Sequence, residues 1–352
     1  MFPQNRLFVS TAEQLNQYGK ATCRFVNGTA LQVDDERQTA LVKLSNGEEE
    51  VFDFHMLIIA TGASTQSPLL GLNTDSVALR ASWSIFRQAL PTAKSILIAG
   101  GGPTGVEVAG ELGEHLNGRA GWFASKLNSP KVSITLVTAG NNILPTLRSP
   151  IAKTAEEYLA KVGVTIIKGD RVEKVEPENA GLANSSLITK ASITLSSGVV
   201  IVADLFIPAT GTTPNTSFLP SSLLELGGRV KTNPHTLRAD AAKGPRIYAI
   251  GDASSYARPA IHNILSAIPV LGSNIKRDLL LDAKKLESEV GPDRIFEEDT
   301  RETQLVPIGK SKGVGSAMGW RVPSWMVWMI KGRDYWLWTT GKLWSGRQWE
   351  KE

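Results

Sequence analysis

Residues 95–112 read SILIAGGGPTGVEVAGEL, and this stretch decides the fold of the chain. Its first part, Ile96–Ala99, predicts a buried strand. After a run of glycines, apolar residues recur at helical spacing, at Val106, Ala109 and Leu112. A further apolar strand predicted over Val132–Val137 completes a βαβ unit. A GxGxxG run between the strand and the helix of such a unit predicts dinucleotide binding, and the alternative is a glycine-rich turn in an unrelated α/β protein.

The residues of this glycine run have separate expected roles. Gly100 permits the tight turn, Gly102 lets the backbone approach a pyrophosphate, and Gly105 lets helix and strand pack closely. The start of the helix, which contains Pro103 and Thr104, presents unpaired N–H groups to the anion. We therefore predict that these five residues hold the pyrophosphate of NAD(P)H.

The end of the second strand bears on the choice between NADH and NADPH. Such a unit usually carries an acid here that binds the ribose 2′-hydroxyl, but residues 136–140 read LVTAG and contain no carboxylate. Because Asp or Glu would repel a 2′-phosphate, Thr138 permits NADPH, and we predict that NADPH is used at least as well as NADH. Arg148 downstream is either a cation for that phosphate or a solvated surface arginine.

Strand patterns continue on both sides of this unit. Met56–Ala60 is an apolar run ending in Thr61 and Gly62, which is typical of a strand buried on both faces of a parallel sheet, with a ligand at its end. A similar strand, predicted over Asp204–Ala209, ends next to Gly211. An antiparallel meander is predicted before Met56 from short strands separated by turn residues: Ala21–Phe25, Thr29–Val33 and Ala40–Leu44.

A third landmark is RIYAIGDA over 246–253, an apolar strand that runs directly into Gly251 and Asp252. Taken alone, this Gly-Asp pair would be a turn. An acid fixed at the C-terminal end of a strand, beside a helix predicted to start at about Pro259, can accept a hydrogen bond from a polyol hydroxyl. This arrangement predicts a site for a ribityl chain.

Four motifs follow one another in a recognisable order: ATG at 60–62, GGGPTGVEVAGEL at 100–112, ATGTTPN at 209–215 and YAIGDAS at 248–254. In this order the chain resembles the FAD/NAD(P)H oxidoreductases with two dinucleotide-binding domains, the pyridine nucleotide-disulfide oxidoreductase superfamily. It is most similar to the AMID-type branch, the apoptosis-inducing-factor homologues that include the ferroptosis suppressor and are related to type II NADH:quinone reductases. The similarity runs from about residue 18 to beyond 340 and includes GxxxGVGxxxG at 309–319.

The resemblance implies roles that spacing alone does not explain. Glu107 would lie near the nicotinamide, whereas the motif alone would predict a charge on the helix surface. Other positions that would bind cofactors are Thr61 and Gly62 at the end of a strand, Gly211 and Gly251. Asp252 would bind the ribityl chain, and backbone N–H groups near Ile261 would face the flavin pyrimidine. Hydride passes from nicotinamide C4 to flavin N5 in this family, so we expect no catalytic side chain and no metal.

The single cysteine, Cys23, bears on where the electrons go. It excludes a CxxC redox pair and a Cys-based zinc site. Electrons would then leave the flavin to a quinone, oxygen or another small acceptor. The predicted function is FAD-dependent oxidation of NAD(P)H with a quinone-like acceptor; the alternatives are a non-enzymatic NAD(P)-binding or partner-binding remnant without FAD, and a redox enzyme acting on one particular metabolite.

The expected fold is α/β, with a Rossmann-like NAD(P) domain inserted into an FAD domain that lacks its beginning. The family starts with a second GxGxxG for the FAD pyrophosphate, and no such run occurs before residue 90. The chain would thus lack pieces that give high-affinity FAD binding, through a truncated gene model or as a shortened protein. The predicted domains are a partial FAD domain at 1–92, an NAD(P)H domain at 93–208, the continued FAD domain at 209–290 and a C-terminal segment at 291–352.

The C-terminal segment holds all of the excess charge. Apolar residues make up 42% of the chain and charged residues 20%, which excludes disorder. The net charge is +4, yet residues 305–352 carry eight Lys or Arg against three Asp or Glu. Seven of the nine tryptophans lie within 320–349. This Trp-rich basic segment therefore needs its own explanation.

Two interpretations of the segment stay open. Trp325, Trp328 and Met329 at helical spacing, followed by Lys331 and Arg333, suit a peripheral contact with a membrane; alternatively, the aromatic residues cover the flavin domain or a dimer seam. Eight basic residues without a recognition motif argue against nucleic acid. No signal peptide or spanning segment is predicted, so we expect a cytoplasmic protein that is peripheral on a lipid surface such as the mitochondrial outer membrane. The oligomeric state stays open.

Overall fold

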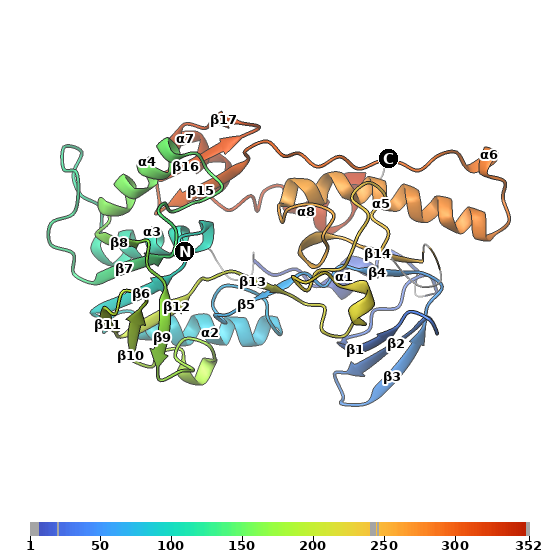
Figure 1. Ribbon diagram of the computed structural model, residues 1–352, viewed down its shortest axis with the longest axis horizontal. Coiled ribbons are helices and arrows are strands. Elements are labelled where there is room, and N and C mark those ends of the chain that lie inside the picture. The colour runs from blue at the N-terminus through green and yellow to red at the C-terminus, as the bar shows by residue number, and fades with distance from the viewer. Residues whose placement is uncertain (1–6, 20, 240–243, 245, 350–352) are drawn as a thin grey trace. The chain divides into compact units, whose positions relative to one another are not determined.

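The computed structural model describes residues 7–349 except residues 20, 240–243 and 245. These residues form two compact units (Figure 1). Unit 1 contains Thr65–Thr212 and Arg301–Thr340 together with the N-terminal residues up to Phe8. Unit 2 contains Val9–Ser64, Thr213–Thr300 and the C-terminal residues from Gly341. The units and the predicted domains divide the chain differently: residues 65–92 of the predicted partial FAD domain lie in unit 1, and the predicted C-terminal segment is shared between the two units.

Unit 1 is built around a parallel sheet with the strand order β12-β6-β7-β8. Three of its strands lie within one residue of their predicted positions: β6 (Ser95–Ala99), β7 (Ser133–Thr138) and β12 (Leu205–Pro208). The fourth strand is β8 (Val164–Lys168). Because side chains alternate along a strand, Ile96 and Ile98 pack with the helices, while Leu97 and Ala99 pack on the opposite face. The sheet is therefore covered on both sides.

Helices cover one face of this sheet and an antiparallel sheet covers the other (Figure 1). The helices are α2 (Ser76–Ala89), α3 (Pro103–Asn117) and α4 (Ser149–Ala160). In α3, Val106 and Ala109 are fully buried, which fits their predicted spacing. The antiparallel sheet has the order β11-β10-β9, formed by β9 (Val172–Glu176), β10 (Ala191–Leu195) and β11 (Val200–Ala203).

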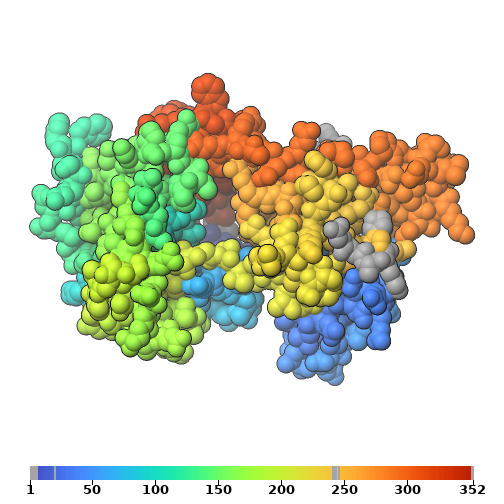
Figure 2. Space-filling model, in the orientation of Figure 1, coloured from blue at the N-terminus to red at the C-terminus, as the bar shows by residue number. Residues whose placement is uncertain are grey.

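The C-terminal part of unit 1 packs on its helices. Strands β15 (Gln304–Ile308), β16 (Lys312–Ala317) and β17 (Trp320–Arg321) form an antiparallel sheet, followed by α7 (Ser324–Val327) and a π-helical turn, Trp328–Gly332. Ile308 approaches α3 so closely that a Cβ on Gly110 would lie 2.8 Å from its side chain. Figure 2 shows these residues, coloured red, lying over the green segment that contains α4. Strands β15 and β16 thus cover α3 and α4 of unit 1.

Unit 2 begins with the predicted meander, displaced along the chain. The order is β1-β2-β3, formed by β1 (Gly28–Asp34), β2 (Thr39–Leu44) and β3 (Glu49–Asp53). The prediction of a strand over 21–25 was wrong. In that stretch Arg24 forms an ion pair with Glu50 at 3.1 Å and lies over the Phe52 ring, so it contacts β3 through its side chain and not through a ladder.

Two landmark strands pair in unit 2. Strand β4 (Leu57–Ile59) lies parallel to β14 (Ile247–Ala249), and the long helix α5 (Ile261–Asp282) follows β14 in the chain. Ile59 is buried but Ile58 is 49% exposed, so the expectation of burial on both faces was wrong. Among the residues described, β14 is the one partner strand of β4.

The remaining elements are short. The helices are α1 (Thr11–Leu15), α6 (Glu287–Val290) and α8 (Thr340–Trp344), and the strands are β5 (Ala63–Thr65) and β13 (Thr212–Pro214). Single 3-10 turns occur at Asn184–Ser186, Ser221–Leu223, Gly251–Ala253 and Arg347–Trp349. None of the helices within the described residues is both long and apolar enough to cross a membrane.

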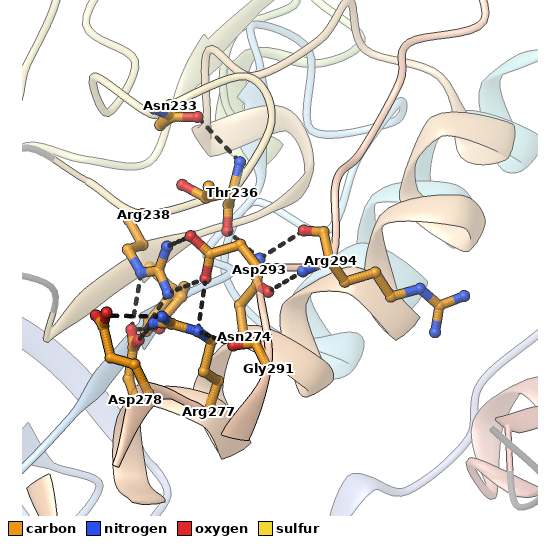
Figure 3. A network of polar contacts seen from close by, with 11 residues as sticks. Asn233, Thr236, Arg238, Asn274, Arg277, Asp278, Gly291, Asp293 and Arg294 are labelled. Atoms are coloured by element: carbon orange, nitrogen blue, oxygen red, sulfur yellow. Dashed lines mark hydrogen bonds and ion pairs between the residues drawn. The ribbon is translucent and has the colours of Figure 1, made fainter. Parts of the chain in front are cut away.

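A network of charged side chains fastens α5 to its surroundings in unit 2 (Figure 3). Arg238 lies 2.6 Å from Asp278 of α5 and 2.7 Å from Asp293, and its side chain is only 14% exposed. The Tyr248 hydroxyl donates to Asp278 as well. The hydrogen bonds from Arg238 hold the pKa of Asp293 below its ordinary value. Three segments that are distant in sequence are thereby joined by ionised groups.

Candidate functional site

The glycine-rich turn after β6 is sterically tight. Gly100 has a φ of +121°, and a Cβ there would lie 2.1 Å from the carbonyl oxygen of Ala209. A Cβ on Gly105 would lie 1.9 Å from the carbonyl oxygen of Gly100. No side chain fits at either position without movement of the backbone. The turn therefore brings the start of α3 directly against the end of the sheet.

The start of α3 is left open toward the outside of this turn. Gly102 is the N-cap residue, it makes no side-chain cap, and no atom lies within 4 Å of a Cβ built on it. Pro103 has no N–H, and the next N–H groups, those of Thr104 and Gly105, have no acceptor within the helix. These donors and the positive end of the helix dipole form an anion-binding position of the kind that holds a pyrophosphate.

A cavity of about 520 Å³ lies in front of this turn, entirely within unit 1. The predicted site residues that line it are Gly100, Gly102, Pro103, Thr104, Thr138 and Gly211. The other residues of its wall, not predicted from the sequence, are Thr65, Leu70, Ala99, Val137, Ala139, Gly140, Asp170, Arg171, Val172, Ala209, Thr210 and Thr212. Most of these follow the C-terminal ends of parallel strands, and that position is the signal that could have found them. The wall fits a dinucleotide.

Thr138 and Arg148 lie in different surroundings. Thr138 ends β7, and a Cβ on Gly101 would lie 2.5 Å from its hydroxyl oxygen, so the threonine packs against the glycine-rich turn. Arg148 lies 2.9 Å from Glu302 and also donates to the carbonyl oxygen of Gly319. It is absent from the cavity wall. The interpretation of Arg148 as a cation for a 2′-phosphate is therefore wrong: this arginine joins α4 to the C-terminal sheet.

Glu107 in α3 is partly buried, with a side chain that is 18% exposed, and it is paired with the C-terminal segment. The Lys331 ammonium lies 2.6 Å from its carboxylate and also donates to the carbonyl oxygen of Leu305 at 3.1 Å. Burial raises the pKa of Glu107, and Lys331 opposes that rise. Lys331 belongs to the π-helical turn, a feature that is frequent at functional sites. The expectation that Lys331 stands beside an exposed tryptophan face was therefore wrong, because it turns inward.

In unit 2, Thr61 and Gly62 are bonded to the segment around Asn215. The Thr61 hydroxyl donates to the carbonyl oxygen of Asn215 at 2.7 Å, and the Asn215 N–H donates to Gly62 at 2.9 Å. Gly251 has a φ of +75° at the end of β14. The carboxylate of Asp252, next to it, has no hydrogen-bond partner among the described residues. An acid left without a partner at a strand end fits a polyol hydroxyl.

The start of α5 also fits a polar ligand. Ile261 is the first residue of the helix, and Ala260 at the N-cap gives no side-chain cap. Asn263 is 1% exposed, and its side-chain oxygen has no hydrogen-bond partner in the described chain. The Nε2 atom of His262 is likewise buried without a partner there. The two side chains with unused polar capacity, Asn263 and His262, were not predicted; they follow directly after Ile261, whose backbone N–H the resemblance assigned to the flavin pyrimidine.

Comparisons with known proteins place the chain in a family. Residues 3–269 match the family of pyridine nucleotide-disulphide oxidoreductases. The chain belongs to that family. Oxidoreductase phnG of Penicillium herquei is 58% identical over 351 residues, which cover 100% of this chain and 84% of that protein. Human ferroptosis suppressor protein 1 is 25% identical, over 90% of this chain and 78% of that protein. The predicted family and its AMID-type branch are confirmed.

Solved structures agree with the fold. NDH2 of Plasmodium falciparum in complex with NADH has a TM-score of 0.56 at 16% identity, over 86% of this chain and 78% of that one. A NAD-dependent persulfide reductase of A. fulgidus has the same TM-score at 17% identity, over 82% of this chain. The chain spans 49% of that reductase. The predicted two-dinucleotide-binding-domain fold is confirmed, and with the family it supports the predicted cofactors, FAD and NAD(P)H.

Proposed function

We propose that this oxidoreductase takes hydride from NADPH or NADH and passes the electrons through FAD to a small quinone-like acceptor. The observation that carries the proposal is the cavity in unit 1, whose wall joins the uncapped start of α3 to the ends of the parallel strands. That wall supplies N–H donors for a pyrophosphate and open strand ends for an adenosine. It fits a pyridine nucleotide, which is the hydride donor of the family.

The side chains of this protein bind and orient more than they react. FAD, when bound, supplies the group that accepts hydride and releases electrons one or two at a time. Asp252 would accept hydrogen bonds from the ribityl hydroxyls, and the N–H groups at Ile261 would face the flavin pyrimidine. Gly100, Gly102 and Gly105 hold the nucleotide by letting the backbone approach it. No step needs a protein nucleophile.

A quinone-like acceptor is supported by two features. The chain has one cysteine, so a dithiol cannot relay the electrons. Reduction of a quinone to a hydroquinone takes up two protons, and the Glu107–Lys331 pair holds a proton in a half-buried position on the helix whose first turn lines the cavity.

The experiment is to purify the chain, measure bound flavin by absorbance and follow NADPH and NADH oxidation with menadione and with oxygen. Bound FAD and NAD(P)H-dependent menadione reduction support the proposal. If the chain binds nucleotide but neither binds flavin nor turns over, even after incubation with excess FAD, the result would contradict the proposal and favour the non-enzymatic alternative. Rapid turnover with oxygen but not with menadione would contradict the quinone-like acceptor, while the oxidation of NAD(P)H through FAD would stand.

We propose also that residues 320–338 contact a lipid surface. Trp320, Trp325 and Trp338 are 80%, 63% and 64% exposed, whereas Val327 between them is fully buried. Amphipathic indoles of this kind favour the interface of a bilayer. Sedimentation with phosphatidylcholine/phosphatidylserine vesicles tests this: the W325A/W338A variant should lose binding, and V77A, which removes an exposed apolar side chain of α2, should not. Equal binding by all three proteins would refute it.

A further inference from the structure

One wall of the nucleotide cavity carries a cation that no carboxylate neutralises. Arg171 follows β8 and is exposed, and it lines the cavity beside Thr138, Ala139 and Gly140. It is the only Lys or Arg in that wall. Within the described residues, no Asp or Glu lies within ion-pair distance of its guanidinium. A positive charge is therefore available at the end of the cavity formed by β7 and β8.

The backbone of Arg171 is held by hydrogen bonds, whereas its guanidinium has no ion-pair partner among the described residues. Its N–H donates to the Asp170 carboxylate at 3.0 Å, and its carbonyl oxygen accepts from the Ser196 N–H at 2.9 Å. Asp170 lies between β8 and β9, and Ser196 lies in the turn between β10 and β11. The backbone of Arg171 at the cavity wall is thus held on two sides.

The neighbouring acid is turned away from this cation. The Asp170 carboxylate accepts from the hydroxyls of Ser196 and Ser197, at 2.6 and 2.5 Å, and from the Ser197 N–H at 3.1 Å. These hydrogen bonds hold the pKa of Asp170 below its ordinary value. With its oxygens occupied by these donors and by the Arg171 N–H, Asp170 is not free to form a fork-shaped pair with the arginine.

The neighbouring strand offers no acid either. Thr138 ends β7 where an acid would bind a ribose 2′-hydroxyl, and the sequence contains no Asp or Glu between Glu114 and Glu156. In the sheet, Thr138 is paired with Lys168, so Arg171 lies three residues beyond the partner of Thr138. Lys168 is held by Glu156 at 3.0 Å. Among the described residues, the ends of β7 and β8 therefore carry one guanidinium without an ion-pair partner, and the carboxylate beside it in the cavity wall, that of Asp170, is occupied by its own hydrogen bonds.

We propose that Arg171 binds the 2′-phosphate of NADP(H), so that this end of the cavity is a phosphate subsite. The inference rests on the proposed function, because the pyrophosphate at the start of α3 sets the direction in which the adenosine points. A guanidinium offers two parallel N–H donors to phosphate oxygens, which a lysine cannot match. A 2′-phosphate is close to doubly charged at pH 7. The subsite makes the protein select the phosphorylated nucleotide.

The test compares two ligands that differ in this phosphate, adenosine 2′,5′-bisphosphate and AMP. Their affinities for the full chain are measured by isothermal titration calorimetry at constant pH and ionic strength. We expect the bisphosphate to bind roughly 10- to 100-fold more tightly, as a charge-assisted pair predicts. R171A should remove this ratio and keep the AMP affinity, R171K should keep part of it, and T138E should reverse it. K131A, which removes an exposed lysine outside the cavity wall, should keep the ratio unchanged.

Each outcome decides between two statements. If R171A keeps the ratio of the two affinities, or lowers both affinities equally, the 2′-phosphate subsite is overturned while the nucleotide site stands. If neither ligand binds the unaltered protein, the proposed function fails and the subsite fails with it. Turnover gives a second readout, because R171A should raise the KM for NADPH about tenfold or more and leave the KM for NADH within twofold.

Discussion

The two units stabilise the parallel strands that lead to their expected ligand sites in different ways. In both, a parallel strand ends in a glycine at which a ligand is expected. Unit 1 surrounds its four parallel strands with apolar layers on both faces, and Ile96, Leu97 and Ile98 are almost completely buried. In unit 2 the parallel strands β4 and β14 form a pair in the described part of the chain, and Arg238, Asp278 and Asp293 fasten α5 beside them. Unit 1 packs its parallel strands between two apolar layers, and unit 2 adds a network of ionised groups to its own apolar clusters.

This difference predicts different sensitivities. A close-packed turn is destabilised when a side-chain atom is added, because the interior has no room for that atom. A buried ionic network fails when a partner is removed, because the charge that remains is no longer compensated. The variants that follow add atoms to unit 1 or remove charges from unit 2 and from the contact of α3 with the C-terminal segment.

The largest effect is expected from R238A in unit 2. It removes the hydrogen-bonded cation of Asp278, which is 5% exposed and keeps Arg277 at 3.7 Å, and should lower the free energy of unfolding by about 3 kcal/mol. Urea denaturation followed by circular dichroism measures this loss, and NADP⁺ binding by unit 1 should persist below the transition. K174A, which breaks an exposed ion pair, is the control and should cost less than about 1 kcal/mol. A similar loss in both variants would contradict the special role of the network.

The next largest effect is expected from G105A in unit 1. The added methyl would lie 1.9 Å from the carbonyl oxygen of Gly100, so the backbone must move at a cost of about 1–3 kcal/mol. Because this movement reshapes the glycine-rich turn, NADP⁺ binding measured by calorimetry should be lost. G227A is the matched control, since a Cβ there meets no atom within 4 Å. Unimpaired nucleotide binding in G105A would show that the turn tolerates a shift.

A smaller and pH-dependent effect is expected from K331A. The variant leaves Glu107 buried without its cation, so the pKa of Glu107 should rise further and stability should fall by about 1–2 kcal/mol at pH 7. The folded-state pKa is raised, so the unfolded chain loses the proton first as pH increases. Stability should therefore decrease from about pH 4.5 upward.

Denaturation in urea between pH 4 and pH 8 measures this slope. The double variant E107Q/K331A removes the titrating carboxyl and should show no extra slope relative to E107Q alone. A K331A variant with the pH profile of the unaltered protein would mean that Glu107 finds another partner.

The smallest effect is expected on the outer face of the C-terminal segment. W325A removes a side chain that is 63% exposed and should change the free energy of unfolding by less than about 0.5 kcal/mol. V327A, two residues further on, removes buried methyl groups and should cost about 2 kcal/mol. Thermal denaturation compares the two. A costly W325A would mean that the indole packs in solution and is not available to a lipid surface.

Local patterns predicted much of unit 1. The strand and helix around Gly100 follow from spacing within 20 residues, whereas β8 at the edge of the sheet buries only Val164 completely. The meander of unit 2 was only partly predicted. Its third strand, Glu49–Asp53, is rich in acids and is half-exposed along an edge, so it carries a weak apolar signal.

In the candidate site, too, the sequence predicted residues of local motifs but not those placed by distant contacts. Gly100, Gly102 and Thr138 were predicted because their motif is local, whereas Arg171 and the Lys331 partner of Glu107 were not. Arg171 reaches the cavity because β8 is paired with β7, and Lys331 because the C-terminal sheet packs on α3. Both depend on contacts between segments that are distant in sequence. Arg148 was weighed as a cation because it follows β7, yet its position is set by Glu302, which spacing cannot reveal.

The pair formed by Glu107 and Lys331 has a consequence for the history of the chain. The two positions are separated by 224 residues, and each is costly without the other because an unpaired charge would remain half-buried. A drift of either residue to a neutral one should therefore be followed by a change of its partner. Among descendants of one ancestral sequence, positions 107 and 331 should vary together, with a neutral pair replacing the charged one, so that the end of the chain cannot evolve independently of the nucleotide-binding helix.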